Sequence, residues 1–372
     1  MSEWLEPLFK KMTEQKDVNR YLLDGSKPVF VYGTGSFARD VFKVLVQGGV
    51  YVSAFLDHRE PAPESLDGVP VLHPEAAKNA IVVIGIHNRA ADILTIIRRL
   101  SEYGVSRVIS SVEIFDRFGS VLRDRYWLTN REFYFSCKSF IERGRLLLKD
   151  DASRELYLNI IRFRLTGDSS VLPAPDFEHQ YFSQDVPNWR MPLRLVDCGA
   201  FDGDTLMGFI NAGIKIDAVA AFEPDDVNFS KLSKFVARHP SEIPDATLYP
   251  CGVYVSTTRL SFEIGQGEAS AISNKGGNIV QCVALDDVIP TFAPNLIKMD
   301  IEGAETDALL GARHIINTYL PGLAISVYHR PEHLWQIPML VEDIAPGKYD
   351  FYIRCHAMST FDTVLYCISK HS

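Results

Sequence analysis

The segment LVDCGAFDGDT, Leu195–Thr205, decides the fold of the second half of the chain. An apolar run ends at Asp197, and Gly199 and Gly203 follow with the spacing D-x-G-x-x-x-G. An apolar strand that runs directly into a glycine turn and then a helix is typical of a ligand-binding loop in a parallel α/β sheet. The unusual feature is the acidity of the loop, because Asp202 and Asp204 flank Gly203.

These aspartates argue against a bound phosphate. Two like charges about 4 Å apart repel by about 4 kcal/mol at an effective dielectric constant of about 20. The N-terminus of a helix returns only about 0.3–2 kcal/mol to an anion. S-adenosylmethionine carries a sulfonium and an ammonium group but no phosphate. The acidic loop therefore favours this ligand over a dinucleotide, with Asp197 facing its amino-acid end directly or through water.

A second acidic position follows the next apolar run, AVAAFEPDD. Glu223 lies 24 residues after Gly199 (223 − 199), and Pro224 turns the chain away from the strand. A carboxylate at the tip of the second strand can accept hydrogen bonds from both hydroxyl groups of a ribose. The alternative is that Glu223 is only an acid at the start of a solvated helix.

Two further segments place polar side chains at the ends of strands. In LIKMDIEGAE, Asp300 and Glu302 come after a strand, and in LAISVYHRPEHLWQIP, His329 does so. We expect Asp300, Glu302 and His329 near the substrate, where one of them removes the proton from a hydroxyl group. One alternative is that Asp300, Glu302 and Glu305 bind a divalent metal, but we assign none. Another is that Glu302 and Glu305 only favour the start of a helix, and that His329 is an ordinary loop histidine.

In this order, the segments VDCGAFDGDT, AFEPD, VALDDV, LIKMDIEGAE and SVYHRPEHLWQIP resemble the FkbM family of S-adenosylmethionine-dependent methyltransferases. The resemblance covers about residues 193–368 and implies the class I methyltransferase fold and O-methylation, often of sugars. One departure is Phe201, where many such loops carry a second glycine. The resulting cofactor-binding candidates are Asp197, Gly199, Ala200, Phe201, Asp202, Gly203, Asp204, Thr205, Glu223 and Pro224.

The whole chain is predicted to be an α/β protein in three parts. Strand and helix patterns alternate over residues 1–112, which predicts a small Rossmann-like domain. Residues 113–190 form a helical connector, and residues 191–372 form the methyltransferase domain. Its sheet is mostly parallel, and the segments YDFYIRCH and TVLYCIS are expected to form an antiparallel pair at its C-terminal edge.

The small domain contains a second glycine loop, VYGTGSFARD. Gly33, Gly35 and Ser36 lie between a strand and a helix, and Asp57 follows the next strand, 22 residues after Gly35 (57 − 35). This arrangement suits a nucleotide or nucleotide sugar, although a tight turn needs the same small residues for packing alone. The domain is similar to those in front of some sugar acetyltransferases, which implies binding or assembly but no catalysis.

The amino-acid composition limits the classes of partner and the cellular location that we expect for the chain. The net charge is −9, so no nucleic-acid partner is expected. No apolar run approaches the roughly 20 residues that span a bilayer, and the N-terminus does not read as a secretory signal. The six cysteines form no C-x-x-C pair. We therefore expect free thiols and a cytoplasmic protein that acts on a small-molecule or sugar substrate, with a homo-oligomer as one of the open oligomeric states.

The resulting hypothesis is an in-line transfer of a methyl group from S-adenosylmethionine to a hydroxyl of a sugar, glycan or sugar-derived metabolite. The cofactor already carries an activated methyl group, so the protein mainly aligns the reactants. Two alternatives remain. One is an NAD-dependent oxidoreductase that uses the N-terminal glycine loop, and the other is a non-catalytic protein that binds sugar nucleotides.

Overall fold

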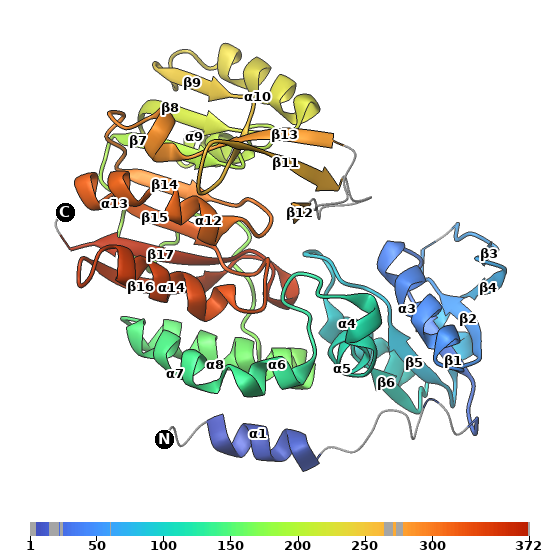
Figure 1. Cartoon of the computed structure of the whole chain (residues 1–372). Helices are drawn as coiled ribbons and strands as arrows, with labels where there is room; N and C mark the ends of the chain where they lie inside the picture. The colour runs from blue at the N-terminus through green and yellow to red at the C-terminus, as the bar shows by residue number, and fades with distance from the viewer. Residues whose placement is uncertain are drawn as a thin grey trace. The chain divides into compact units, whose positions relative to one another are not determined.

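Two mostly parallel sheets organise the chain, and a small mixed sheet adds to the second of them (Figure 1). The computed structural model describes residues 5–14, 22, 25–59, 61–263, 271–272 and 278–370. Contacts between Cα atoms divide the chain into two compact units. The first unit contains Met1–Glu142, Glu155–Pro175 and Ala357–Phe361, and the second contains Arg143–Arg154, Asp176–His356 and Asp362–Ser372.

The first unit is built on a six-stranded sheet with the order β3-β4-β2-β1-β5-β6. Its strands pair in parallel except for the antiparallel pair β3–β4. Because helices cover such sheets, the central strands are apolar and buried along their whole length. The strands are β1 (Val29–Tyr32), β2 (Val52–Leu56), β3 (Ser65–Leu66), β4 (Val69–Leu72), β5 (Ile81–Ile84) and β6 (Arg107–Ile109).

The helices of this half of the chain alternate with those strands and then follow one another from α5 to α8. They are α1 (Leu5–Glu14), α3 (Ser36–Gln47), η1 (Pro74–Ala77), α4 (Ile93–Glu102), α5 (Ser111–Leu122), α6 (Arg131–Ser136), α7 (Lys138–Leu147), α8 (Asp151–Thr166) and η2 (Ser169–Val171). Ser110 and Glu113 form a capping box at the start of α5. The hydroxyl of Tyr157 in α8 donates a hydrogen bond to the carbonyl of Ile141 in α7.

The second unit is built on a seven-stranded sheet with the order β16-β17-β15-β14-β7-β8-β9. Five strands are parallel, and β17 pairs antiparallel with both β15 and β16. This is the mostly parallel sheet with an antiparallel C-terminal pair that the sequence predicts. Its strands are β7 (Leu193–Cys198), β8 (Ile216–Phe222), β9 (Ala246–Tyr249), β14 (Leu296–Met299), β15 (Gly322–Ser326), β16 (Tyr349–Cys355) and β17 (Thr363–Ser369).

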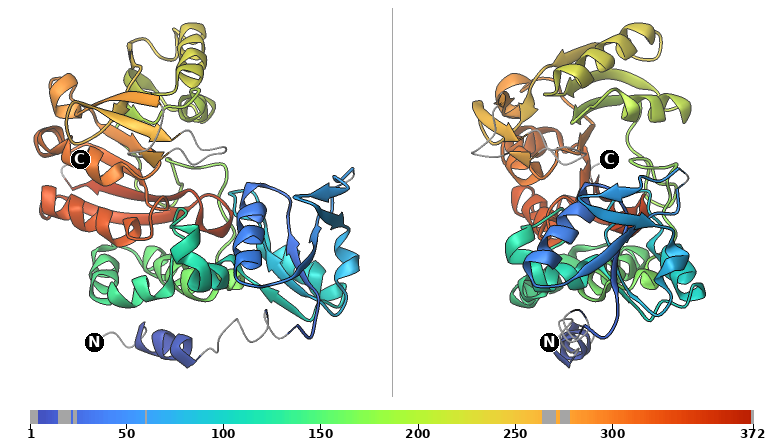
Figure 2. Two further views of the ribbon diagram at one scale, coloured as in Figure 1. Left: turned by 45° about the vertical axis from the view of Figure 1, so that its right-hand side comes forward. Right: turned by 90° about the vertical axis from the view of Figure 1, so that its right-hand side faces the viewer.

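Helices cover both faces of the seven-stranded sheet. Figure 2 shows α9 and α10 on one face and α12, α13 and α14 on the other. Leu206 and Phe209 of α9 and Leu232 of α10 pack with Leu195 and Val219 of the sheet in one buried core. The helices are α9 (Asp204–Asn211), α10 (Asp226–Arg238), α11 (Leu285–Val288), α12 (Glu305–Leu310), α13 (Arg313–Tyr319), α14 (His333–Ile344) and the short η3 (Met358–Thr360) of the first unit.

The apolar runs ATLYPCGVYV (246–255) and VQCVALDDV (280–288) each predict one strand, and the structure differs from both because a small mixed sheet, β10-β13-β11-β12, contains parts of them. Residues 246–255 form two strands in different sheets, and the segment VALDDV turns into helix α11 after β13. In α11, the carboxylate of Asp286 accepts hydrogen bonds from two amides in the first turn of α13, those of His314 and Ile315. The strands are β10 (Gly252–Val253), β11 (Thr258–Glu263), β12 (Ala271–Ile272) and β13 (Asn278–Val283).

Two general expectations can be compared with the structure. All six cysteines are free thiols, and Cys198, Cys251, Cys282 and Cys367 are buried. Among the described residues, no helix is both long and apolar enough to cross a membrane.

His87, which follows β5, lies among aromatic rings in the first unit. Its ring centroid is 4.8 Å from that of Phe361 and 5.2 Å from that of Trp127. Burial, with a smaller contribution from Arg125, lowers the pKa of His87 to about 3. The folded protein therefore holds this histidine neutral at pH values where the unfolded chain protonates it.

This difference predicts that the first unit loses stability as the pH falls below about 6.5, because the unfolded state then binds one more proton. The loss from His87 is up to about 1.4 kcal/mol per pH unit until the pH reaches its folded pKa. Hydrogen exchange of the β5 amides at pH 6.5, 5.5 and 4.5, corrected for intrinsic rates, measures it. The variant His87→Leu should show a shallower dependence, and equal slopes in both proteins would contradict the prediction.

Candidate functional site

The predicted site residues of the second unit meet at one edge of its sheet. Strands β7, β8, β14 and β15 are parallel neighbours, so their carboxyl ends lie side by side. Asp197 is in β7, Glu223 follows β8, Asp300 follows β14 and His329 lies three residues after β15. Ligands of open α/β sheets bind at this edge.

Asp197 is paired within the sheet. It lies opposite Lys298 in the register of β7 and β14, and its Oδ1 is 3.0 Å from the Lys298 ammonium nitrogen. Both side chains are almost wholly buried. Burial lowers the pKa of Lys298, but the carboxylates of Asp197 and Asp300 outweigh this effect and hold the pKa above its ordinary value. Asp197 therefore faces a protein cation in this structure.

Lys298 also holds the glycine loop, because its ammonium group donates a hydrogen bond of 2.7 Å to the carbonyl of Gly199. Gly199 has φ +78°, and a Cβ atom there would lie 2.0 Å from the carbonyl oxygen of Asp300. The glycine is thus required for the contact between this loop and the end of β14. A glycine at a ligand-binding loop also lets a ligand approach the backbone, which would be a second reason for the same residue.

The remaining loop residues present both buried and exposed groups. Ala200, Gly203 and Thr205 are buried, whereas Asp204 and the Phe201 side chain are exposed and Asp202 is intermediate. Phe201 adopts φ +48°, a conformation that a non-glycine residue seldom takes. Its ring lies beneath the Lys231 ammonium group, 5.8 Å from the nitrogen.

Glu223 is buried beside this loop. Its two carboxylate oxygens accept hydrogen bonds of 2.8 Å from the amides of Phe201 and Asp225. Burial raises the pKa of Glu223 to about 7, against the opposing effect of these two amides. Pro224 follows it and is partly exposed. Each carboxylate oxygen has a second lone pair, so the group can accept further hydrogen bonds.

Asp300, Glu302, Glu305 and His329 form a second group, which we call the acid–histidine cluster. Nδ1 of His329 is 2.7 Å from Oε1 of Glu305. On the other side of the ring, Nε2 is 3.3 Å from Oδ1 of Asp300 and 3.6 Å from Oε2 of Glu302. Burial lowers the pKa of His329, but Glu305 first, and then Glu302 and Asp300, raise it to about 10.

Two members of the cluster are in unusual environments, since one is fully buried and the other has a strained backbone. Glu305 is fully buried, and Oε2 of its carboxylate is 3.2 Å from Nδ1 of His333 in α14. Despite its burial, the two histidines hold the pKa of Glu305 well below its usual range. Glu302 has φ +54°, which costs a non-glycine residue about 1–2 kcal/mol. Strained residues of this kind concentrate at functional sites.

Three residues at this edge were missed by the sequence analysis. Tyr181 comes from the long loop before β7, and its hydroxyl donates a hydrogen bond of 2.8 Å to Oδ2 of Asp300. Lys298 could have been found from the sequence, because it is a single charged residue inside the apolar run LIKM and must therefore have a partner for its charge. His333 and Tyr181 had none, because only the tertiary structure brings them to the cluster.

In the first unit, the four predicted residues of the N-terminal loop also lie together. Gly33 has φ +110°, and a Cβ atom there would be 2.8 Å from Ile86. Gly35 caps α3, which begins at Ser36. Asp57 accepts hydrogen bonds from the Thr34 hydroxyl, 2.6 Å, and from the Arg59 guanidinium, 2.5 Å. Burial raises the pKa of Asp57, but these bonds lower it well below its usual range.

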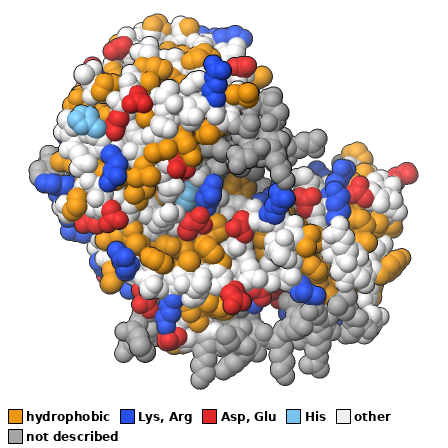
Figure 3. All heavy atoms as spheres, in the orientation of Figure 1, with side chains coloured by type: hydrophobic (Ala, Val, Ile, Leu, Met, Phe, Trp, Pro, Cys, Tyr) orange, Lys and Arg blue, Asp and Glu red, His pale blue; other side chains and the backbone are white. Residues whose placement is uncertain are grey.

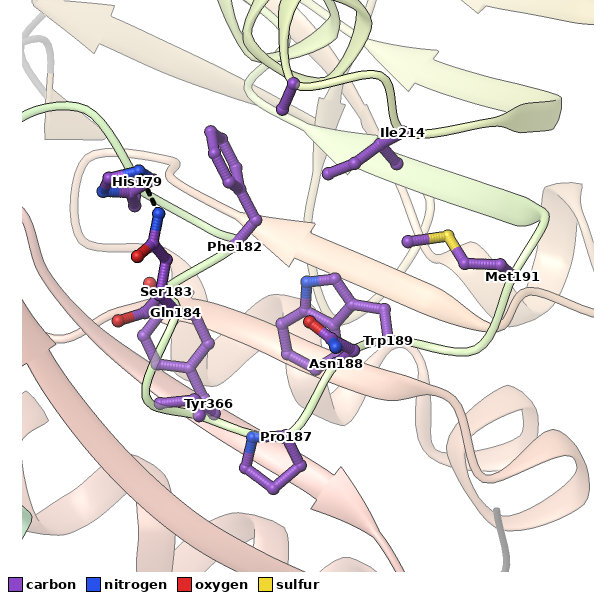
Figure 4. A pocket seen from close by; sticks show the side chains of 12 residues that line it. His179, Phe182, Ser183, Gln184, Pro187, Asn188, Trp189, Met191, Ile214 and Tyr366 are labelled. Atoms are coloured by element: carbon purple, nitrogen blue, oxygen red, sulfur yellow. Dashed lines mark hydrogen bonds between the residues drawn. The ribbon is translucent and has the colours of Figure 1, made fainter.

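A pocket of about 370 Å³ in the second unit lies away from every predicted site residue. Figure 4 shows that most of its side chains come from the loop 179–191, including Phe182, Gln184 and Trp189. Nε2 of Gln184 is 2.8 Å from Nε2 of His179, whose Nδ1 faces Asp176 at 2.8 Å.

On the face of the molecule that Figure 3 shows, acidic and basic side chains of the described residues are interspersed.

Comparison with known proteins agrees with this architecture. Residues 197–354 match the family model of the methyltransferase FkbM domain. A search of the curated proteins returned no match. Methyltransferase FkbM from Methylobacillus flagellatus KT is a similar solved structure, with a TM-score of 0.80 and 22% identity over 98% of this chain and 99% of that chain. This likeness shows the fold.

A putative rRNA-methylase from Clostridium thermocellum is 14% identical and covers 47% of this chain and 84% of its own, but its TM-score of 0.31 is too low to support an argument. The family model and the sheet order agree with the resemblance that the motifs showed. Residues 197–354 therefore form a methyltransferase domain of the FkbM family.

Proposed function

We propose that the chain transfers a methyl group from S-adenosylmethionine to a hydroxyl group of a sugar, glycan or sugar-derived metabolite. The observation that carries this proposal is the contact between the acidic glycine loop and the acid–histidine cluster. The Cβ position of Gly199 falls 2.0 Å from the carbonyl oxygen of Asp300. A cofactor on the loop and an acceptor at the cluster would thus be neighbours.

The residues of the loop fit the cofactor. The carboxylates of Asp202 and Asp204 are not buried, so they can face an ammonium or sulfonium group. Glu223 has lone pairs that can accept hydrogen bonds from the hydroxyls of a ribose. Asp197 would not contact the cofactor directly, because its carboxylate pairs with Lys298 and thereby holds this lysine against the loop. S-adenosylmethionine, when bound, supplies the activated methyl group.

The acid–histidine cluster would receive the proton of the acceptor. His329, with a pKa of about 10, already carries both ring protons at neutral pH. It therefore acts as a donor and a positive charge, and the carboxylates of Asp300 and Glu302 remain to accept the proton. Tyr181 fixes one oxygen of Asp300, Oδ2, and leaves Oδ1 on the side of His329.

We assign methyl transfer to residues 191–372 and a binding or assembly role to residues 1–112. The oxidoreductase alternative requires Asp57 to accept hydrogen bonds from a ribose, but each of its oxygens already accepts at least two hydrogen bonds from Arg59 and Thr34, which occupy both lone pairs. The non-catalytic alternative leaves no purpose for the strained Glu302 and the buried pair of His329 and Glu305. Both alternatives are less well supported than methyl transfer.

The variant Glu223→Gln should bind S-adenosylhomocysteine about tenfold more weakly, because the amide accepts fewer hydrogen bonds from a ribose. Calorimetry measures this, with Asp226→Asn as a matched control on the exposed start of α10. In the wild type, affinity should rise from pH 6 to pH 8 as Glu223 ionises near its pKa of about 7, and Glu223→Gln should lose that rise. Unchanged affinity in Glu223→Gln would contradict the ribose assignment.

The variant Asp300→Asn should lower kcat by roughly 10²–10⁴, the range for loss of a general base. Its affinity for S-adenosylhomocysteine should stay within about threefold of the wild-type value. Turnover is measured with radiolabelled S-adenosylmethionine and a panel of sugars and nucleotide sugars. Asp307→Asn, on helix α12, is the control. If Asp300→Asn turns over as fast as the wild type and the control Asp307→Asn, the proton acceptor is a residue other than Asp300.

A second candidate function concerns the N-terminal loop, where the exposed Arg59 guanidinium lies beside Thr34 at the start of α3. Arginine suits phosphate groups, so the loop could hold the diphosphate of a nucleotide sugar. Uridine diphosphate is the probe, and Arg59→Gln should weaken its binding about tenfold relative to the control Arg98→Gln. Calorimetry that detects no binding of uridine diphosphate by the full chain would remove this candidate.

A further inference from the structure

We propose that the acid–histidine cluster binds a divalent cation, with Asp300, Glu302 and His329 as its ligands. The part of this inference that concerns an acceptor rests on the proposed function, whereas the binding of the ion does not. Asp300, Glu305 and His329 have potential ligand atoms that lie within 4.8 Å of one another. Glu302 is outside that group, but its Oε2 atom is 3.6 Å from Nε2 of His329, whereas Glu305 faces the other ring nitrogen.

The distances around Nε2 of His329 match those between the ligands of one ion. Ligands held about 2.1 Å from an octahedral ion stand about 3 Å apart when they are adjacent. Oδ1 of Asp300 is 3.3 Å from Nε2, and Oε2 of Glu302 is 3.6 Å from it. The side chain of Glu302 is 37% exposed, so it can adjust without disturbing the core.

Glu305 orients the histidine for this role. It accepts a hydrogen bond from Nδ1 of His329, which directs Nε2 toward Asp300 and Glu302. Histidines that bind metals commonly donate their second ring N–H to a carboxylate in this way. The carboxylate of Glu305 is itself fixed by the amides of Ile301 and Gly303.

The charge balance of the cluster points to a cation as well. Three carboxylates surround His329, and Glu305 is wholly buried. Its two oxygens lie against the rings of His329 and His333, which hold its pKa well below the usual range. Asp300 and Glu302 approach the same histidine from its other side, and a divalent ion beside Nε2 would add two positive charges there.

The mixed ligand set suggests which ion to use. Carboxylate oxygens suit Mg²⁺ and Mn²⁺, and imidazole suits later first-row metals, so Mn²⁺ is an appropriate probe for both. Three protein ligands leave positions open on a six-coordinate ion. Two neighbouring hydroxyl oxygens of a sugar could occupy such positions, and the ion would then orient the acceptor.

The test measures Mn²⁺ binding to the full chain after dialysis against a chelator, in the absence of S-adenosylmethionine. Electron paramagnetic resonance should show about one bound ion per chain and a nitrogen coupling from an imidazole ligand. Asp300→Asn and His329→Gln should each weaken binding at least tenfold, and His329→Gln should remove the nitrogen coupling. Glu305→Gln should weaken binding about 10- to 100-fold, as loss of an orienting carboxylate does.

Asp307→Asn is the matched control and should bind Mn²⁺ within twofold of the wild type. Circular dichroism and binding of S-adenosylhomocysteine verify that each variant is folded. The absence of saturable Mn²⁺ binding, or equal binding in Asp300→Asn and Asp307→Asn, would overturn the cation site. If the wild-type protein binds Mn²⁺ but no S-adenosylhomocysteine, the result counts against the proposed function and leaves the cation site standing. Circular dichroism alone then verifies that the variants are folded.

Discussion

The buried ion pair of Asp197 and Lys298 is the interaction on which the site depends. It joins β7 to β14 in the middle of the sheet, and the same ammonium group holds the carbonyl of Gly199. Two buried charges are acceptable only as a pair, and removal of one partner typically costs about 3–5 kcal/mol. The path of the glycine loop is therefore tied to the register of two central strands.

The position of the acid–histidine cluster follows from this arrangement. Because Gly199 packs against the carbonyl of Asp300, the loop and the end of β14 have a common boundary. Tyr181 and His329 then approach Asp300 from two other elements, the loop before β7 and the end of β15. Without a cation, His329 can carry protons on both ring nitrogens between these carboxylates. When a metal ion binds, the ion replaces the proton on Nε2, and the arrangement of the carboxylates stays the same.

Much of the fold could be predicted from the chain alone. Buried strands such as VFVY and LIKM were visible as apolar runs, and the closely spaced C-terminal strands without a helix between them indicated their antiparallel pairing. The run VQCVALDDV predicts a strand to its end, but its second half is helix α11, in which Asp286 caps the start of α13. Local patterns cannot show a capping partner that lies 28 residues away.

The sequence by itself determined which strands end in Asp197, Glu223, Asp300 and His329, because the strand pattern and the parallel topology bring such ends to one edge. Only the tertiary structure decided their charge states and partners. Asp197 is neutralised by a lysine, Glu305 is buried between two histidines, and Tyr181 reaches Asp300 from a loop without any regular pattern. The physical reason is that burial and charge pairing depend on distances between residues far apart in the chain, which periodicity does not encode.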